Sequence, residues 1–482
     1  MASTVAAEPI AEPIRVTALG TAADGTVHLL ADHADTTARC GFADWHSYVM
    51  CVDWLEEPMC PVCVADLAVE VGVEIPKDVL DELDEIAAPW PGRWLLRPRE
   101  GDLERVVGIF AGPGGWDAAL DVIGALYDAV GVDFSGDACA TAERAGHRRI
   151  VADVTRLDPG HPALRWTAGI IISPPCPSWS IAGKRAGLTA ESLKILADMF
   201  TAVSEAARSL WADDAGGGQE ERATPSETTW SEIRAMADAM PDKRAGLMAE
   251  VLIWPLALQL QGAPISWLAM EQSDNLPQEV REGIETELAV AGRSQQQWVE
   301  LDAAAYGVAT HRRRVFLMAT RHGRIPGSVR SARPIAEQTF AAAFGWKPGE
   351  RVNTRGVRGL NANGRPKGGN VFSADRVGWC LTGKARGWYR ESDGYRLTLD
   401  EGGQAVGFLP SHPWQGSRSS AFQQIGDAVS PPVGAAVMGA LIGQRWEDGV
   451  ARYLGCVYRG SPPTPARRAD DVGPVASWAL AA

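Results

Sequence analysis

From residue 104 onward, short continuous apolar runs are followed in turn by segments with helical spacing of apolar residues. Short, continuous apolar runs are typical of strands buried on both faces of a sheet, and apolar positions that recur every three or four residues are typical of helices. The predicted strands are 106–110, 129–134, 168–172 and 265–270. The predicted helices are 116–127, 138–145, 191–210 and 246–261. Strands that alternate with helices predict a doubly wound α/β fold with a mostly parallel sheet.

The segments around this alternating part differ in composition. Residues 1–15 repeat the tetrapeptide AEPI, which is typical of a disordered tail. Residues 16–66 predict a small module, and residues 67–103, which are acidic and then rich in Trp and Pro, predict a linker. Gly, acidic and polar residues at 212–245 predict an insertion or mobile loop. Residues 446–482 predict the end of a helix followed by a flexible tail.

The overall composition and charge indicate where a protein with this fold would be found in the cell. The 482 residues are 46% hydrophobic and carry a formal net charge of -14, which is unlike a protein that coats nucleic acid nonspecifically. No apolar run reaches the roughly 18–20 residues of a membrane span. The first residues also lack the basic and then apolar order of a secretory signal. We therefore expect a cytoplasmic protein with no membrane partner.

Four of the eight cysteines lie close together near the N-terminus. Cys60-Pro-Val-Cys63 has the CxxC spacing of half a zinc site. His28 and Cys40 would complete a Cys3His site, which predicts a structural Zn²⁺ that stabilises a segment too small for its own core. The competing ligands are Cys51, His33 and His46. The alternative is a set of reduced thiols without metal.

The sequence VVGIFAGPGGW runs from a strand through a glycine-rich turn into a helix. Gly112, Gly114 and Gly115 permit a tight turn and the close approach of a ligand to the helix N-terminus. The spacing is not the GxGxxG of a dinucleotide site, so both a nucleotide-like ligand and a plain turn are compatible with it. Asp133 and Asp153 follow the next two strands, where an acid can bind ribose hydroxyls. Together the three features predict a ligand at one edge of the sheet.

Cys176 stands in SPPCPSWS, directly after the predicted strand at 168–172. The two prolines before it fix the backbone and donate no hydrogen bond, so the thiol lies on a rigid turn at the carboxyl end of the strand. Sheets of this class bind ligands at that edge. A structural cysteine would more usually lie within a strand as a small hydrophobic residue. The sequence therefore predicts a functional thiol.

The motifs FAGPGG and PPC together resemble the family of DNA (cytosine-5) methyltransferases that use S-adenosylmethionine. Three later segments resemble further blocks of that family. WLAMEQSDN contains Glu271, YGVATHRRRVFLMAT contains Arg312 and Arg314, and FQQIGDAVSPPVGAAV lies near the end. Five blocks in the family's order, over roughly 104–320 and 420–440, are more than chance agreement produces.

The resemblance implies a role for each matched residue. Cys176 would be the nucleophile, and Glu271 the acid that contacts the ring nitrogen and the exocyclic amine of cytosine. Arg312 and Arg314 would orient the base. The implied cofactor contacts are Phe110, Ala111, Gly112, Gly114, Gly115, Trp116, Asp133, Asp153, Pro174, Asp427, Ala428 and Val429. Among them Phe110 would pack on the adenine, Asp133 would bind the ribose and Asp153 the adenine amino group.

The chemistry of cytosine explains these residue types. Carbon 5 is a poor nucleophile until a thiolate adds to carbon 6, and a cysteine thiolate both attacks and leaves readily. An acid hydrogen-bonded to the ring nitrogen prevents negative charge from accumulating there. Both carbons are out of reach in a stacked duplex, so the base must be swung out. The implied activity is that of a DNA (cytosine-5-)-methyltransferase that acts as a monomer on double-stranded DNA and is associated with the nucleoid.

The same resemblance divides the chain. It implies a catalytic domain at 104–330, a target-recognition region at 331–420 and a return into the catalytic domain at 421–445. Residues 351–370 hold five Arg or Lys and no acid, which predicts contact with DNA phosphates or guanine edges.

The chain departs from the family pattern at several positions. Gly108 stands where Asp is common, Pro177 stands where Gln follows the cysteine, and Asp427 stands where the last block has Asn. The further departures are Gln272, Ser273, Thr310 and His311. Two alternatives stay open: the same chemistry on RNA, and a DNA-binding relative that has lost catalysis. The biological setting also stays open between restriction-modification, an orphan regulator and a phage enzyme.

Overall fold

The structure is a computed structural model that divides the chain into two compact units. The units are 1–99 with 160–163, and 100–159 with 164–482. The residues that the structure describes are 103–157, 159, 164, 166–176, 178–179, 186–207, 227–321, 323–354, 362–363 and 370–459, together with the backbone of 18–21, 27–30 and 47–49.

The first unit contains a small antiparallel sheet. Its strands, in the order β2-β1-β3, are β2 (Val27–Leu30), β1 (Ala18–Thr21) and β3 (Ser47–Val49). Of the predicted zinc ligands, His28 falls in β2 with its side chain outside the described residues. Cys40, Cys60 and Cys63 lie outside them altogether. The zinc site therefore stays a prediction.

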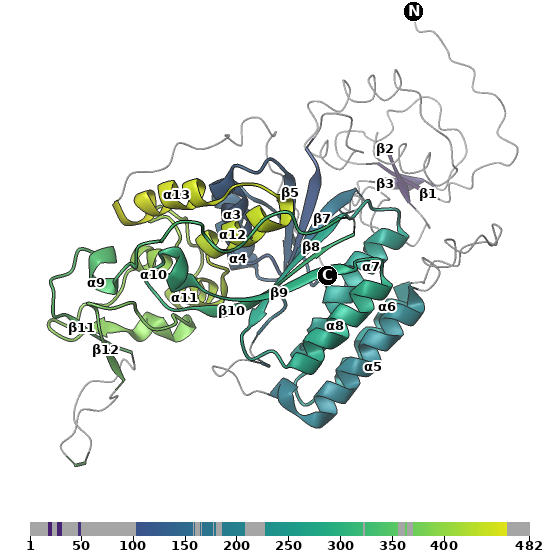
Figure 1. Ribbon diagram of the computed structural model, residues 1–482. Helices are drawn as coiled ribbons and strands as arrows, with labels where there is room; N and C mark the ends of the chain where they lie inside the picture. The colour runs from purple at the N-terminus through teal and green to yellow at the C-terminus, as the bar shows by residue number, and fades with distance from the viewer. Residues whose placement is uncertain are drawn as a thin grey trace, which may run out of the picture. The chain divides into compact units, whose positions relative to one another are not determined.

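The second unit is built on a seven-stranded sheet (Figure 1). In spatial order its strands are β6 (Arg148–Val151), β5 (Asp128–Asp133), β4 (Arg105–Ile109), β7 (Thr167–Ile172), β8 (Trp267–Ser273), β10 (Arg313–Thr320) and β9 (Gln295–Asp302). Only β10 runs antiparallel to its neighbours within this sheet. β7 and β8 are buried along their whole length, as expected for central strands covered on both faces.

Helices cover both faces of this sheet, as Figure 1 shows. On one side lie α3 (Gly115–Ile123), α4 (Gly136–Arg144), α12 (Pro431–Ile442) and α13 (Glu447–Arg459). On the other lie α5 (Ala190–Ala206), α6 (Glu227–Ala235), α7 (Glu250–Leu260) and α8 (Gln278–Val290). The predicted doubly wound, mostly parallel α/β fold is confirmed.

The predicted strand at 265–270 is too short at its carboxyl end. β8 continues to Ser273, so Glu271 lies inside the strand and pairs in register with Phe316 of β10. The antiparallel partner β10 extends the ladder past the apolar run, and a local apolar pattern cannot reveal that extension. The functional edge of the sheet therefore begins within β8.

The segment at 212–245, which was predicted to be an insertion or mobile loop, is helical over its described part. Residues 227–245 form α6, the 3-10 helix η5 (Met236–Ala239) and the start of η6 (Lys243–Ala249). Trp230, Ile233 and Ala237 recur every three or four positions and are buried, so an apolar stripe drives helix formation among the polar residues. This part of the insertion packs against α5.

The recognition region has its own small core. Its elements are α9 (Phe340–Ala343), β11 (Arg351–Asn353), β12 (Val371–Ser373), η8 (Gly383–Gly387), β13 (Tyr389–Arg390) and α10 (Leu399–Ala405). Phe340, Trp388 and Phe408 belong to one buried apolar cluster there. Gly378 exchanges backbone hydrogen bonds with Ala309 (2.8 Å) and His311 (2.9 Å), which holds the region against the chain just before β10.

The last block forms α11 (Arg418–Asp427) and α12. Across the part of the chain that the structure describes, 418–442 is the one helical stretch long and apolar enough to cross a membrane, and 89% of its apolar window is buried within the protein. Helices in the core of a globular protein have the same composition. The stretch therefore packs as core.

Candidate active site

The glycine-rich corner after β4 has an unusual backbone. Phe110 has φ 58° and is the one non-glycine residue with positive φ among those described. Gly112 (φ 55°) and Gly114 (φ 101°) continue the left-handed path into α3. A side chain at Gly112 would meet no atom within 4 Å, so the corner borders open space. Strained residues of this kind are concentrated at ligand sites.

Asp133 lies at the end of β5, next to that corner. Its Oδ2 accepts a hydrogen bond from the Gly112 N–H at 2.9 Å, and its Oδ1 accepts one from the Ser135 N–H at 2.9 Å. Each carboxylate oxygen can accept a further bond, so the side chain is both held in place and able to bind a diol. Asp153 is exposed after β6, and its Oδ1 accepts bonds from the Thr155 N–H (2.9 Å) and hydroxyl (2.8 Å).

A buried ion pair supports the glycine-rich corner from below. Arg149 is 2% exposed and donates to both carboxylate oxygens of Asp117, at 3.1 and 2.7 Å. Its Nε also donates to the Gly112 carbonyl at 3.4 Å. Burial acts to raise the pKa of Asp117, but the opposing charge of Arg149 holds that pKa down at about 2. A Cβ at Gly131 would stand 2.6 Å from the Arg149 guanidinium, so glycine at that position makes room for the pair.

The chain segment at Ala428 and Val429 returns to the start of α3. A Cβ at Gly115 would lie 2.3 Å from the Val429 carbonyl oxygen, so only glycine allows this approach. Trp116 is 5% exposed and packs in the core against Phe316, while its Nε1–H donates to the Ser173 hydroxyl at 2.9 Å. Trp116 therefore joins α3 to the end of β7 from beneath the corner.

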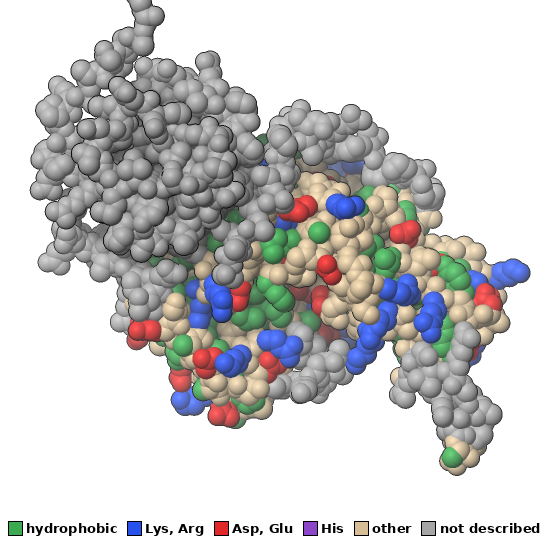
Figure 2. All heavy atoms as spheres, turned by 180° about the vertical axis from the view of Figure 1, so that it is seen from behind, with side chains coloured by type: hydrophobic (Ala, Val, Ile, Leu, Met, Phe, Trp, Pro, Cys, Tyr) green, Lys and Arg blue, Asp and Glu red, His purple; other side chains and the backbone are tan. Residues whose placement is uncertain are grey.

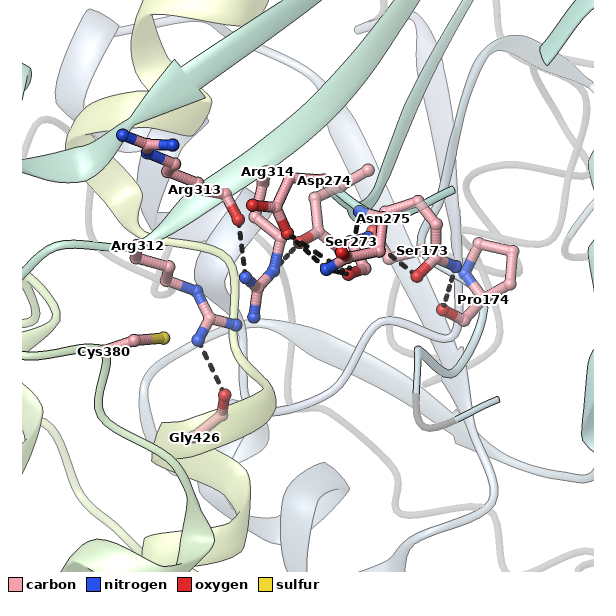
Figure 3. Close-up of polar contacts among 12 residues, drawn as sticks. Ser173, Pro174, Ser273, Asp274, Asn275, Arg312, Arg313, Arg314, Cys380 and Gly426 are labelled. Carbon is pink, nitrogen blue, oxygen red and sulfur yellow. Dashed lines mark hydrogen bonds and ion pairs between the residues drawn. The ribbon is translucent and has the colours of Figure 1, made fainter. Parts of the chain in front are cut away.

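The four predicted catalytic side chains converge at the carboxyl edge of the sheet. Cys176 is half-buried after β7, and Glu271, in β8, is 6% exposed. The Arg314 Nε lies 2.9 Å from the Glu271 Oε1. Arg312 is 4% exposed and donates to the Gly426 carbonyl at 2.8 Å. Figure 3 shows the guanidinium groups of Arg312 and Arg314 close together, with Gly426 beneath Arg312.

Burial dominates the electrostatics of this cluster. It raises the pKa of the Cys176 thiol, and the Arg314 guanidinium opposes that rise while the Glu271 carboxylate adds to it. Burial also raises the pKa of Glu271, against the opposing charges of Arg314 and Arg312. Burial and the charge of Arg314 lower the pKa of Arg312. Burial and the charges of the two guanidinium groups thus act in opposite directions on both the thiol and the carboxyl, and burial has the larger effect.

Asp427 connects this cluster to the ligand corner. Burial raises the pKa of its carboxyl, and Arg312 and Arg314 oppose the rise while the charge of Asp133 adds to it. Its Oδ2 accepts a hydrogen bond from the Gln423 side chain at 2.6 Å. The Asp427 carboxyl is thus close enough to both sets of residues for their charges to affect its pKa.

Residues 105–207 match the sequence pattern of the family described as C-5 cytosine-specific DNA methylase. That stretch contains the glycine-rich corner, Asp133 and Cys176, whose geometry is given above. This stretch of the chain is therefore similar to the methylase domain of that family.

Two solved structures are similar to the chain at low identity. A methyltransferase of Entamoeba histolytica, EhMeth, has 14% identity and a TM-score of 0.45, over 71% of this chain and 98% of that one. The Dnmt2 methyltransferase of S. pombe has 12% identity and a TM-score of 0.42, over 70% of this chain and 98% of that one. No curated protein matches the chain. The similarity to the methylase family therefore rests on the match over residues 105–207.

Three residues to which sequence reasoning gave no role lie near the predicted site residues. Gln272 is fully buried, and its Nε2 donates to the Pro174 carbonyl at 3.0 Å, which holds the turn before Cys176. Cys380 reaches in from the recognition region, with its sulfur beside Arg312 in Figure 3. Phe134 follows Asp133 and is 71% exposed. Only Phe134 carried a sequence signal, as an aromatic residue directly after an acid at a strand end.

We expect Phe134→Ala to weaken the binding of S-adenosylmethionine about 5- to 20-fold, because a ring exposed beside Asp133, the predicted ribose-binding residue, can cover the adenine. Isothermal titration calorimetry with S-adenosylhomocysteine measures this without catalysis. Leu126→Ala is the matched control, since Leu126 is 51% exposed elsewhere on the domain. Equal affinity in the wild type and both variants would show that Phe134 does not contact the cofactor.

The recognition region presents basic side chains near the catalytic cluster. Lys384 and Arg386 are exposed on η8. A Cβ at Gly426 would stand 2.4 Å from the Gly383 nitrogen, so η8 packs directly on the residue that accepts the Arg312 hydrogen bond. On the face in Figure 2, several Lys and Arg side chains lie close together where this region joins the methylase domain. These groups are suited to nucleic-acid phosphates.

The predicted role of the basic segment at 351–370 and the effect of Pro177 are not tested by the described residues. Residues 355–361 and 364–369 of the predicted basic segment lie outside the described residues, and so does Pro177. Within the described ranges no three His, Cys, Asp or Glu side chains come together as a metal site.

Proposed function

We propose that this protein transfers a methyl group from S-adenosylmethionine to carbon 5 of cytosine in duplex DNA, with Cys176 as the nucleophile. The observation that carries the proposal is the convergence of Cys176, Glu271, Arg312 and Arg314, from three separate segments, at one edge of the sheet. The similarity to the methylase family over residues 105–207 supports the reaction class.

The residues present fit the cofactor. Asp133 would bind the ribose diol, Phe134 would cover the adenine, and Gly112 borders the open space that the methionine portion needs. S-adenosylmethionine supplies an electrophilic methyl group on a positively charged sulfur. Asp427, whose pKa is affected by charges from both groups of residues, would contact the cofactor next to the reacting base.

The protein's own residues activate the cytosine. The Cys176 thiol loses its proton and its sulfur forms a bond with carbon 6, and Arg314 favours the thiolate by opposing the effect of burial. Glu271, whose pKa is raised, would donate to ring nitrogen 3, which makes carbon 6 more electrophilic toward the thiolate. Addition of the sulfur at carbon 6 leaves an enamine in which carbon 5 is nucleophilic. After carbon 5 accepts the methyl group, a base removes its proton and the carbon–sulfur bond breaks, which regenerates Cys176.

Access to the half-buried thiol requires the base to leave the helical stack. Enzymes that act on a base inside a duplex swing it out into a pocket. Arg312 and Arg314 would contact the base in that pocket, while Lys384 and Arg386 would bind phosphates beside it. Restriction-modification is one biological setting that is compatible with this proposed activity.

A side-by-side assay tests the function. We expect radiolabelled methyl groups from S-adenosylmethionine to appear as 5-methylcytosine in duplex DNA and not in transfer RNA. Label in RNA alone would mean that the substrate is RNA and not DNA, with the same methyl transfer to carbon 5 of cytosine. Absence of label from both, with no covalent complex on DNA that carries 5-fluorocytosine, would contradict the proposal in full.

A further inference from the structure

The turn that carries Cys176 is held on both sides. Before it, Gln272 donates to the Pro174 carbonyl at 3.0 Å. After it, the Trp179 N–H donates to the Cys176 carbonyl at 3.0 Å, which closes a tight turn around the nucleophile. The position of Trp179 and of its neighbour Ser178 therefore determines the position of the thiol.

Both of these neighbours are fully buried. Trp179 is 0% exposed, and a Cβ at Gly187 would stand 2.8 Å from its ring, so the ring packs directly under that backbone. Ser178 is also 0% exposed, and its carbonyl accepts a bond from the Gly187 N–H at 3.1 Å. A buried hydroxyl needs a partner, and the partner of Ser178 comes from a distant part of the chain.

That partner is Asp242, at the end of the described part of the insertion. The Ser178 hydroxyl donates to the Asp242 Oδ2 at 2.8 Å. Arg244 donates two hydrogen bonds of 2.9 Å to the same carboxylate, from Nε to Oδ1 and from Nη2 to Oδ2. Asp242 also begins η6 as its N-cap, accepting from the Arg244 N–H at 3.2 Å. The carboxylate is therefore fixed before it receives the Ser178 bond.

We infer that Asp242 is a positioning residue for Cys176, acting through Ser178 and held in place by Arg244. The expected effect of Asp242 on the reaction with DNA rests on the proposed function, whereas its expected effect on the position and reactivity of the Cys176 thiol does not. The bond from Arg244 keeps the pKa of Asp242 at about 2, so the carboxylate stays charged at any pH where the enzyme would work. A hydrogen bond to a charged acceptor is stronger than one between neutral groups, which suits an anchor that must hold a buried turn.

The first measurement is the alkylation of Cys176 by iodoacetamide, followed by mass spectrometry of its peptide. Loss of the anchor frees the half-buried thiol, so Asp242→Ala should react about fivefold faster than the wild type. Cys139 is 1% exposed in the core and reports unfolding of the whole domain in the same sample. Its rate should not change. Faster alkylation of both cysteines would mean general destabilisation and would count against a positioning role.

The second measurement is the rate of covalent trapping on duplex DNA that carries 5-fluorocytosine. A misplaced nucleophile attacks more slowly, so Asp242→Ala should trap about tenfold more slowly although its thiol alkylates faster. Opposite changes in the two rates are not expected from a residue that only stabilises the fold. A wild type that does not trap would contradict the proposed function, and the alkylation result would still decide the role of Asp242.

Three further variants complete the test. Asp242→Asn keeps an oxygen that accepts from Ser178 and should restore both rates toward those of the wild type. Ser178→Ala combined with Asp242→Ala should be no worse than either change alone, because the two residues act as one unit. Asp238→Ala is the matched control, since Asp238 forms an exposed pair with Lys243 at 2.6 Å nearby. Wild-type rates in Asp242→Ala would overturn the inference.

Discussion

Cys176→Ala should lose methyl transfer to DNA by on the order of 10⁴-fold or more, to the level of a reaction without enzyme. In the proposed mechanism the Cys176 thiolate is the group that makes carbon 5 reactive, and neither the acid nor the arginines of the cluster can replace it as a nucleophile. Arg312 and Arg314 donate hydrogen bonds but cannot attack, and Glu271 is paired with Arg314 at 2.9 Å. A radiolabel assay under single-turnover conditions measures the loss.

The same variant should bind the cofactor normally. The cofactor residues lie around Asp133, and a small, half-buried side chain contributes little to stability, so S-adenosylhomocysteine should bind Cys176→Ala with wild-type affinity. Normal binding with no transfer separates the loss of the nucleophile from misfolding. Residual transfer within tenfold of the wild type would mean that another residue is the nucleophile, with Cys380 the next candidate because it lies beside Arg312.

Glu271→Gln should lower the rate of transfer by about 10² to 10⁴, the range that a positioned acid or base contributes. Glutamine preserves the shape of the side chain but cannot exchange a proton with the ring. Alanine would be a poorer choice, because it also removes the side-chain oxygen that can still accept a hydrogen bond from Arg314 in the glutamine variant, and an unpaired buried donor destabilises the protein. Thermal unfolding of Glu271→Gln should accompany the kinetics as a control.

The pH dependence provides a separate test of Glu271. In the proposed mechanism the wild-type reaction needs a protonated Glu271 and a Cys176 thiolate, and burial raises both pKa values. Rising pH removes the first and creates the second, so the profile should be bell-shaped. Glu271→Gln has no carboxyl proton to lose, so its rate should rise with the thiolate and then level off. A bell that persists unchanged in this variant would exclude Glu271 as the titrating acid.

Local sequence was sufficient for the central elements. The apolar runs that form β4, β5 and β7 are continuous because these strands are buried on both faces, and that burial leaves a pattern that can be read without partners. The turn around Cys176 is also local, because two prolines restrict its backbone. The sequence by itself thus determined the α/β class, and it predicted the edge of the sheet where a ligand would bind and the thiol at that edge.

Contacts between distant segments were decided only by the tertiary structure. β8 extends through Glu271 because β10 pairs with it, and the pairing of Glu271 with Arg314 follows from that register. The helices at 227–245 lie in a polar segment whose apolar stripe gains stability only when it packs on α5. No local pattern connects Asp242 with Ser178, since their hydrogen bond joins positions 64 residues apart. Cys176 is therefore recognisable from sequence, whereas the groups that set its charge and position are brought to it by long-range packing.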